Sequence, residues 1–265
     1  SFKVMPDMGD TGLCPRYYLE FCKQYLQRAK MTVILHAKNV DEADFKEMYD
    51  CGVNCVRIIF PMNQPAVGFK AIEMASKYNF EIFINFPRAS QFSILQINAI
   101  VAQLHPYAVK GIYLADSNGS LKPDTVSQMI AHLKPSTYAL GFHAHDNLFL
   151  AQANAIAAIF AGATYIDSSL FGFGKGAGNL RTEGFVSYLH SENLGSEYDL
   201  SICFEGAEYI KSNLQTADNQ YAKDMILSIF NLSQDDAAKL GEFNNPKDYY
   251  QSAAAYCHSL KVKVS

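Results

Sequence analysis

Six short apolar segments recur along the chain, and each is followed by a stretch with helical character. The segments are rich in β-branched and aromatic residues and cover residues 31–36, 55–60, 81–86, 111–116, 139–145 and 164–169. Their starts are spaced by roughly 24 to 30 residues, which is the length of a strand followed by a crossover helix. Near-continuous apolar strands are typical of a parallel sheet covered on both faces. The pattern therefore predicts an α/β fold.

The segments between these strands carry readable helix ends. Asp41 predicts the start of a helix that ends near Gly52, and Lys122-Pro123-Asp124 predicts the start of another. The Ala-rich stretch 147–161 predicts a helix that ends at Gly162. Residues 15–28 also predict a helix, and residues 1–30 contain no convincing strand.

The composition of the chain changes after Ser191. Segments 205–216, 219–232, 233–240 and 246–260 read as helices, and Ser233 with Asp236 has the spacing of a helix cap. We therefore expect two regions, a strand-and-helix domain over residues 1–195 and a C-terminal helical appendage over residues 196–265.

Charge and composition exclude several classes of protein. The formal net charge is -4 without a basic cluster, which argues against a nucleic-acid partner. There is no apolar run of about 18 residues, so we expect no membrane span. The first residues carry no signal-peptide pattern. Since the six cysteines are scattered, we interpret them as reduced thiols in a cytoplasmic protein.

Polar residues collect at the C-terminal ends of the predicted strands. One or two of them would mean little, because α/β loops often begin with polar caps. Together they predict one functional rim. These residues are His36, Asn85, Asp116, Ser117, His143, His145, Asp167 and Ser169.

His143 and His145 are the most specific feature of this rim. Side chains alternate along a strand, so the two imidazoles share a face with Cα atoms about 6–7 Å apart, close enough to bind one metal ion. A single histidine here would more often be a packed strand residue. The pair, followed by the helix-cap residues Asp146 and Asn147, favours metal binding.

Four segments together resemble the metal-dependent aldolase/lyase family, which includes HMG-CoA lyase, isopropylmalate synthase and 4-hydroxy-2-oxovalerate aldolase. The similarity covers residues 31–183 and is closest to the last of these enzymes. The resemblance implies a (β/α)8 TIM barrel, of which this chain contains strands three to eight, followed by C-terminal helices. The segments that carry it are 111–124, 141–147 with its His-x-His-Asp-Asn pattern, 162–170, and the glycine-rich 172–179.

The resemblance also implies roles for individual residues. His143, His145 and Asn179 would bind a divalent metal ion, which could be Mn, Mg, Zn or Co. Asp116 and Asp167 are candidate acceptors that would fix the orientation of the imidazoles. The candidates for substrate binding are Ser117, near the substrate carboxylate, together with Arg57 and Asn85. The loop 172–178 could alternatively bind a phosphate.

These roles imply a metal-dependent carbon–carbon lyase that cleaves a 4-hydroxy-2-oxo acid to pyruvate and an aldehyde. The cleavage leaves an enolate, whose charge a divalent cation offsets. One departure from the family is clear: members begin with an Arg-Asp-Gly motif, and this sequence contains no Arg-Asp pair. The motif supplies a carboxylate metal ligand and an arginine that contacts the substrate, and the general base is expected in the same N-terminal part.

Three explanations of this departure are open: a fragment, a natural truncation completed by a partner, or an inactive relative. The alternative functions are an acyl-CoA condensing enzyme of the isopropylmalate synthase type and a non-catalytic barrel subunit or assembly module. Because an incomplete barrel has two open strand edges, we also expect a homo-oligomer or a partner subunit.

Overall fold

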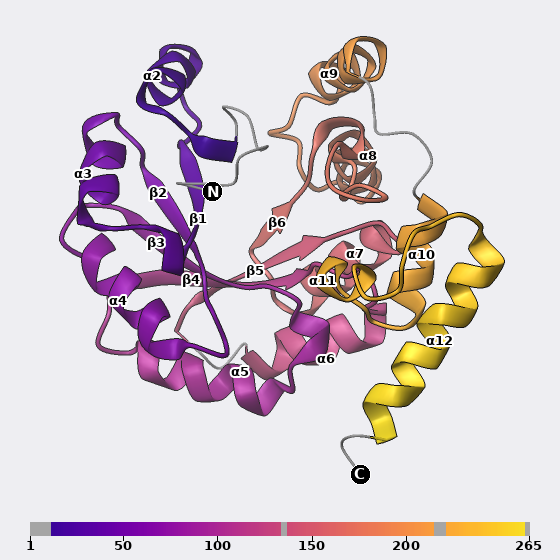
Figure 1. The fold of residues 1–265 in the computed structure, drawn as a ribbon. Helices are drawn as coiled ribbons and strands as arrows, with labels where there is room; N and C mark the ends of the chain where they lie inside the picture. Colours follow the sequence, from indigo (N-terminus) through magenta and orange to yellow (C-terminus); the bar gives the residue numbers. More distant parts are fainter. Residues whose placement is uncertain (1–11, 134–136, 215–220, 263–265) are drawn as a thin grey trace. The chain divides into compact units, whose positions relative to one another are not determined.

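The computed structural model describes residues 12–133, 137–214 and 221–262 (Figure 1). Its sheet has six strands in the order β1-β2-β3-β4-β5-β6, and the pairs β1·β2, β2·β3, β3·β4 and β5·β6 are parallel. The α/β class is thereby confirmed. The strands are β1 (Thr32–His36), β2 (Cys55–Ile59), β3 (Glu81–Phe86), β4 (Val109–Asp116), β5 (Ala139–Ala144) and β6 (Tyr165–Asp167).

A helix follows each strand, as the alternating pattern predicts. Apolar β-branched and aromatic side chains favour the strands, and polar caps begin several of the helices. The predicted start at Asp41 is confirmed, since its side chain accepts hydrogen bonds from the backbone of Ala43 and Asp44. The helices are α3 (Glu42–Asp50), α4 (Pro65–Ala75), α5 (Ile94–Val101), α6 (Pro123–Leu133), α7 (Ala151–Ala161) and α8 (Thr182–Ser191).

The start of α7 differs from the prediction. Gly162 ends the helix at φ 118°, as expected, but the helix begins at Ala151 rather than at residue 147. Asp146 still caps it from a distance, because its carboxylate accepts the N–H of Ala151 at 3.0 Å. The intervening turn belongs to the loop that follows β5.

Two compact units make up the chain. The first comprises residues 1–87, 93–114 and 136–140, and the second comprises residues 88–92, 115–135 and 141–265. Fully buried side chains such as Phe45, Ile58 and Ile84 form the core of the first unit. Burial of each of these contributes about 1.5–3 kcal/mol. The predicted boundary near residue 195 stays a prediction.

The last part of the chain is helical, as predicted. Ser233 caps α11, because its hydroxyl accepts the N–H of Asp236 at 3.2 Å and the Asp236 carboxylate accepts the N–H of Ser233 at 3.0 Å. A separate apolar cluster that includes Leu227, Leu232 and Tyr249 packs these helices together. They are α9 (Leu200–Asn213), α10 (Tyr221–Ile229), α11 (Gln234–Ala237) and α12 (Pro246–Val262).

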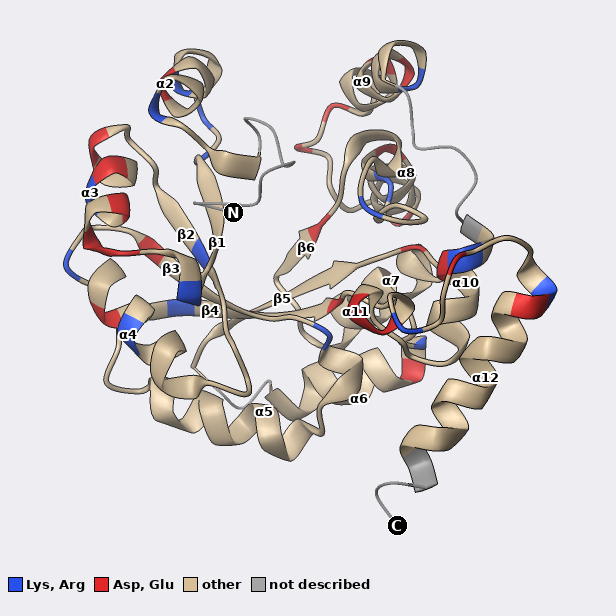
Figure 2. Ribbon diagram, viewed as in Figure 1, with Lys and Arg blue, Asp and Glu red and all other residues tan. Residues whose placement is uncertain are grey.

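The N-terminal part of the described chain is helical. The helix predicted over residues 15–28 is α2 (Arg16–Tyr25), whereas residues 1–11, for which no strand is expected, lie outside the described residues. Within the described ranges, no helix has the length and apolar character needed to cross a bilayer. All six cysteines are free thiols. The ribbon in Figure 2 marks charged residues of both signs, with acidic residues along α3.

Candidate metal-binding site

β5 brings the two predicted histidines together. Their Nε2 atoms lie 3.3 Å apart, and the rings are 5.0 Å apart between centroids at an angle of 75°. Two ligands on one tetrahedral zinc ion, each about 2.0–2.1 Å from it, would have their nitrogens about 3.3–3.4 Å apart. The observed spacing therefore matches that of two imidazoles that share a cation.

Asp167 sets the orientation of the first imidazole. It is the register partner of His143 on the adjacent strand β6, and its Oδ2 lies 2.9 Å from His143 Nδ1. The carboxylate accepts a hydrogen bond from Nδ1–H, which leaves the lone pair of Nε2 pointing toward His145. Both side chains remain about a quarter exposed, at 26% and 23%, so small molecules can reach them.

His145 is held by the glycine-rich segment. Its ring makes hydrogen bonds to backbone groups of Lys175 and Gly178, and these favour the protonated ring. Burial and the neighbouring His143 act more strongly in the opposite direction and lower the pKa of His145 to about 4. His145 is therefore neutral at neutral pH, which is the form that binds metal ions.

Asn179 offers the third donor. It forms an isolated bridge with His145, and its Nδ2 donates to the Phe173 carbonyl at 3.2 Å. Its Oδ1 is buried and accepts no hydrogen bond from the described residues. A buried amide oxygen without a donor is costly, and a cation would satisfy it.

Two glycines leave room for the backbone and the amide of Asn179. Gly178 has φ +97°, and a Cβ there would lie 2.5 Å from the Gly172 carbonyl oxygen. A Cβ at Gly174 would collide with the Asn179 amide. The Asn179 N–H donates to the Gly172 oxygen at 2.9 Å, which closes the loop.

These residues fit a divalent cation. The donor set is two neutral imidazoles and one amide oxygen, which suits divalent ions such as Zn, Mn or Co and leaves positions open for substrate. Within the described parts of the chain, no group of three His, Cys, Asp or Glu side chains converges on one point. The third ligand from this chain would therefore be the Asn179 oxygen.

Asp116 and Ser117 lie at the end of β4. The Asp116 carboxylate accepts the N–H groups of Ser120 and Leu121, each at 3.0 Å, and so organises its own loop. Burial raises the pKa of Asp116 to about 6, although these two N–H groups oppose the shift. The Asp116 carboxylate thus contacts its own loop, and its predicted role as an imidazole acceptor stays a prediction. Ser117 Oγ accepts the N–H of Arg88 at 3.0 Å.

Arg57 and Asn85 lie in the first unit. Arg57 donates to Asn85 Oδ1 at 3.0 Å, and its guanidinium stacks over the Tyr113 ring at 3.7 Å. Asn85 is 4% exposed. The structure brings these two predicted residues together, and the predicted metal ligands form a second group in the other unit.

Three polar residues near Ser117 were not predicted from the sequence. Arg88 and Asn118 are polar residues that follow strand ends. The position at a strand end, which selected Asn85 and Ser117 as candidates, would therefore have selected them too. Asn231 carries no such local signal, because it contacts residues 111 to 141 positions earlier in the chain.

The alternating strands and helices define an α/β protein that carries two adjacent imidazoles at the end of β5. A model of the HMGL-like family matches residues 17–210, and the chain belongs to this family. Lyases and aldolases of the family generally depend on a divalent metal ion.

Individual relatives agree with this assignment. The 4-hydroxy-2-oxovalerate aldolase of Geobacillus genomosp. 3 is 32% identical over 185 residues, which are 69% of this chain and 55% of that protein. The enzyme of the same name from Pseudomonas putida is 33% identical over 196 residues, 72% of this chain and 56% of that protein. This chain thus spans about half the length of the curated relatives it matches.

Solved structures share the fold at low sequence identity. HMG-CoA lyase from Bacillus subtilis superimposes with a TM-score of 0.60 at 17% identity, covering 71% of this chain and 72% of that one. The carboxyl transferase domain of Rhizobium etli pyruvate carboxylase gives 0.70 at 16% identity, covering 92% of this chain and 45% of that one.

Proposed function

We propose that this protein is a metal-dependent carbon–carbon lyase that cleaves a 4-hydroxy-2-oxo acid to pyruvate and an aldehyde. The observation that carries the proposal is the 3.3 Å approach of the Nε2 atoms of His143 and His145. The names of the relatives supply the substrate class. In this proposal β1 to β6 correspond to strands three to eight of an eight-stranded barrel.

The three donors have distinct tasks. His143 presents a lone pair because Asp167 holds its other nitrogen, and His145 presents one because burial keeps it neutral. Asn179 adds an amide oxygen. A divalent cation bound there, with Mn as the first candidate, would polarise the 2-oxo group and offset the charge that develops when the C3–C4 bond breaks.

The remaining candidates would bind the substrate. The Ser117 oxygen accepts a backbone N–H, so its own hydrogen can point outward and donate to the substrate carboxylate. Arg57 and Asn85 are proposed as further substrate contacts. Asp116 would support the Ser117 loop through its bonds to Ser120 and Leu121.

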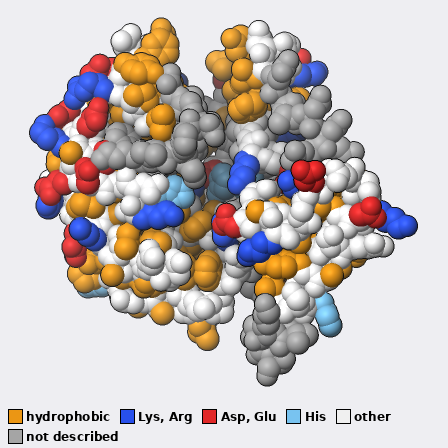
Figure 3. Space-filling view, in the orientation of Figure 1, with side chains coloured by type: hydrophobic (Ala, Val, Ile, Leu, Met, Phe, Trp, Pro, Cys, Tyr) orange, Lys and Arg blue, Asp and Glu red, His pale blue; other side chains and the backbone are white. Residues whose placement is uncertain are grey.

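We also propose that the protein acts in the cytoplasm as a homo-oligomer or with a partner subunit. β1 and β6 end the strand order of the sheet, and open strand edges pair readily with other chains. Helix α2 exposes Tyr17, Phe21 and Tyr25. Figure 3 shows hydrophobic side chains at the surface over this helix. Exposed apolar groups of this kind favour association.

Calorimetric titration with Mn²⁺, paired with an assay of pyruvate release from 4-hydroxy-2-oxovalerate, tests the function. We expect the wild-type chain to bind one Mn²⁺ and His143→Ala or His145→Ala to bind it at least tenfold more weakly. His190→Ala is the matched control, because His190 lies on α8 and contacts the Tyr198 carbonyl. Absence of Mn²⁺ binding would refute the metal site, and binding without pyruvate release would refute the proposed lyase activity of this chain.

A further inference from the structure

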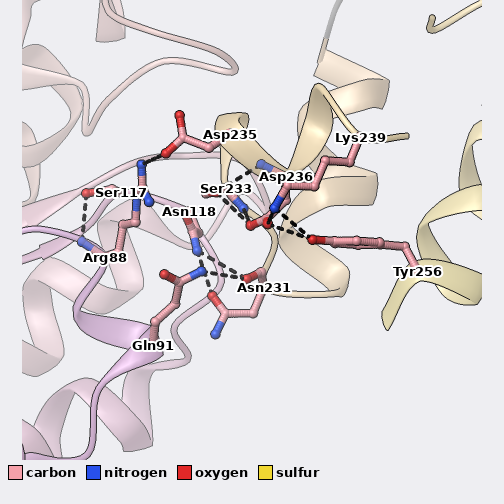
Figure 4. Close-up of polar contacts among 10 residues, drawn as sticks. All are labelled: Arg88, Gln91, Ser117, Asn118, Asn231, Ser233, Asp235, Asp236, Lys239 and Tyr256. Atoms are coloured by element: carbon pink, nitrogen blue, oxygen red, sulfur yellow. Dashed lines mark hydrogen bonds and ion pairs between the residues drawn. The ribbon is translucent and has the colours of Figure 1, made fainter. Parts of the chain in front are cut away.

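Asn231 lies at the turn between α10 and α11 and has a left-handed backbone conformation, with φ 53° (Figure 4). Its amide and carbonyl groups contact two loops that follow strand ends, the β3 loop (residues 88–92) and the β4 loop (residues 117–120). All of these residues belong to the second compact unit.

The contact with the β3 loop is reciprocal. The Ser90 hydroxyl donates to Asn231 Oδ1 at 2.7 Å, and Asn231 Nδ2 donates to the Ser90 carbonyl at 3.0 Å. Gln91 Nε2 donates to the Asn231 carbonyl at 3.2 Å. Both polar ends of the Asn231 amide therefore contact the β3 loop, which fixes the orientation of that amide.

The contact with the β4 loop uses the same amide oxygen. Asn118 Nδ2 and Ser120 Oγ each reach Asn231 Oδ1 at 2.9 Å. The Ser228 hydroxyl, one turn earlier on α10, donates to the Asn118 carbonyl. Asn118 and Ser228 are only 4% and 2% exposed, so water cannot easily replace these bonds if they break.

The two loops meet again at the candidate substrate residue. Ser117 Oγ accepts the N–H of Arg88, so the position of the hydroxyl depends on how the β3 loop lies against the β4 loop. The Arg88 guanidinium also pairs with Asp235 on α11. The turn around Asn231 thus holds both partners of the Arg88–Ser117 bond.

The helices that flank the Asn231 turn are held by apolar packing and by a helix cap. α10 and α12 share the apolar cluster that contains Leu227 and Tyr249, and the Ser233 cap fixes the start of α11. Asp236 Oδ1 accepts hydrogen bonds from Lys239 Nζ at 3.3 Å and from the Tyr256 hydroxyl at 3.2 Å (Figure 4). The bond from Tyr256 connects α11 to α12. Because α10, α11 and α12 are packed together in this way, the turn can hold the β3 and β4 loops in a fixed position.

We propose that Asn231 is a positioning residue for substrate binding: it holds the β3 and β4 loops together and so orients the Ser117 hydroxyl toward the substrate carboxylate. This inference rests on the proposed function. Asn231 itself acts through Ser117 and the Arg88 backbone. The metal ligands on β5 and in the glycine-rich segment have other supports, so metal binding is independent of Asn231.

Asn231→Gly tests this role without a backbone penalty, because glycine adopts positive φ freely. The matched control is Asn193→Gly, since Asn193 has φ 57° on the exposed turn after α8. Amide hydrogen exchange at Arg88, Ser120 and Leu121 measures directly how well the backbone hydrogen bonds of the two loops are protected. We expect about tenfold faster exchange at these amides in the Asn231 variant, and no change at Asp146.

The kinetic measurement then links the loops to the substrate. We expect Asn231→Gly to raise KM for the 4-hydroxy-2-oxo acid by about tenfold with little change in kcat, because the weakened contact binds the substrate equally in the ground state and the transition state. Mn²⁺ affinity should equal that of the wild type. If Asn231→Gly fails to fold, Ser90→Ala removes one hydrogen bond of the same cluster and should shift exchange and KM in the same direction.

The outcomes separate this inference from the proposed function. Wild-type protein that releases no pyruvate refutes the function, and hydrogen exchange then decides the loop-holding role alone. Unchanged exchange at Arg88, Ser120 and Leu121 in a folded Asn231→Gly variant overturns the inference, even if pyruvate is released. Faster exchange with an unchanged KM overturns the link to Ser117.

Discussion

Asp167 and His143 are register partners on adjacent parallel strands, and their side chains meet at 2.9 Å. The carboxylate determines which nitrogen of the imidazole carries the proton. Asp167→Asn keeps the shape but provides a weaker acceptor, so we expect Mn²⁺ affinity to fall by about 10- to 100-fold. Calorimetric titration measures the loss. Asp199→Asn, at the N-cap of α9, is the control, and equal affinity in the two variants would contradict the role of Asp167.

The strands could be predicted because their signal is local. Runs of β-branched residues place strand boundaries within one or two residues for β1, β2 and β3. The spacing of His143 and His145 predicts their shared face, because side-chain alternation is a property of any strand. The relationship between Asp167 and His143 is less accessible, since it depends on the register of β5 against β6.

The contacts of the helical tail could not be predicted from local pattern. Asn231 has an ordinary turn sequence around it, and its partners Ser90 and Asn118 lie more than one hundred residues away. Helix periodicity identifies α10 and α12 but does not specify which loops they approach. The late start of α7 has a similar cause, because the Asp146 carboxylate caps the helix across five residues instead of directly.

Gly178→Ala should impair both folding and metal binding. The residue has φ +97°, and the new methyl group would press on the Gly172 oxygen, the same atom that accepts the Asn179 N–H. The conformation alone costs about 1–2 kcal/mol, and the collision adds to it. We expect a lower denaturation midpoint in urea and weaker Mn²⁺ binding, because Asn179 is displaced.

Gly241→Ala separates the two effects of the Gly178 substitution. Gly241 has a similar φ of +84°, but a Cβ there meets nothing within 4 Å. The control should lose about 1 kcal/mol and keep full Mn²⁺ affinity. A Gly178 variant that behaves like the Gly241 variant would show that the close approach to Gly172 is unimportant.

Leu227→Ala tests whether the tail helices have a core of their own. Leu227 is 2% exposed within the cluster of Leu232, Tyr249 and Ala253, so its truncation leaves a cavity. We expect a loss of about 2–5 kcal/mol in the free energy of unfolding. Ile229→Ala, two residues later and 55% exposed, should change it by less than about 0.5 kcal/mol. Equal effects in urea titrations would contradict the packing of α10 against α12.

Glu81 should make stability depend on pH in the acid range. Hydrogen bonds from Lys110, at 2.7 Å, and from Lys30 lower the pKa of Glu81 to about 2. A carboxyl group whose folded pKa lies below its unfolded value of about 4.3 stabilises the fold above that value and loses this contribution as pH falls toward 2. The pair is partly exposed, so solvent screening limits the effect to about 1 kcal/mol. We therefore expect urea titrations between pH 6 and pH 2 to show a shallower acid slope for Glu81→Gln than for the wild type.

Added salt and a matched variant show whether the loss of stability in acid arises from the charges around Glu81 or from the protein as a whole. About 0.5 M salt should reduce the difference between wild type and Glu81→Gln, because it screens charges over a few ångströms. Glu42→Gln removes a more exposed pair with Lys77, whose side chains are 56% and 54% accessible, and should leave the slope nearly unchanged. If the two variants give the same slope, Lys110 and Lys30 do not hold Glu81 in its charged form. The acid sensitivity would then arise from other groups. The buried Asp116 is not one of them, because its pKa is raised in the folded protein and its protonation at low pH therefore favours the fold.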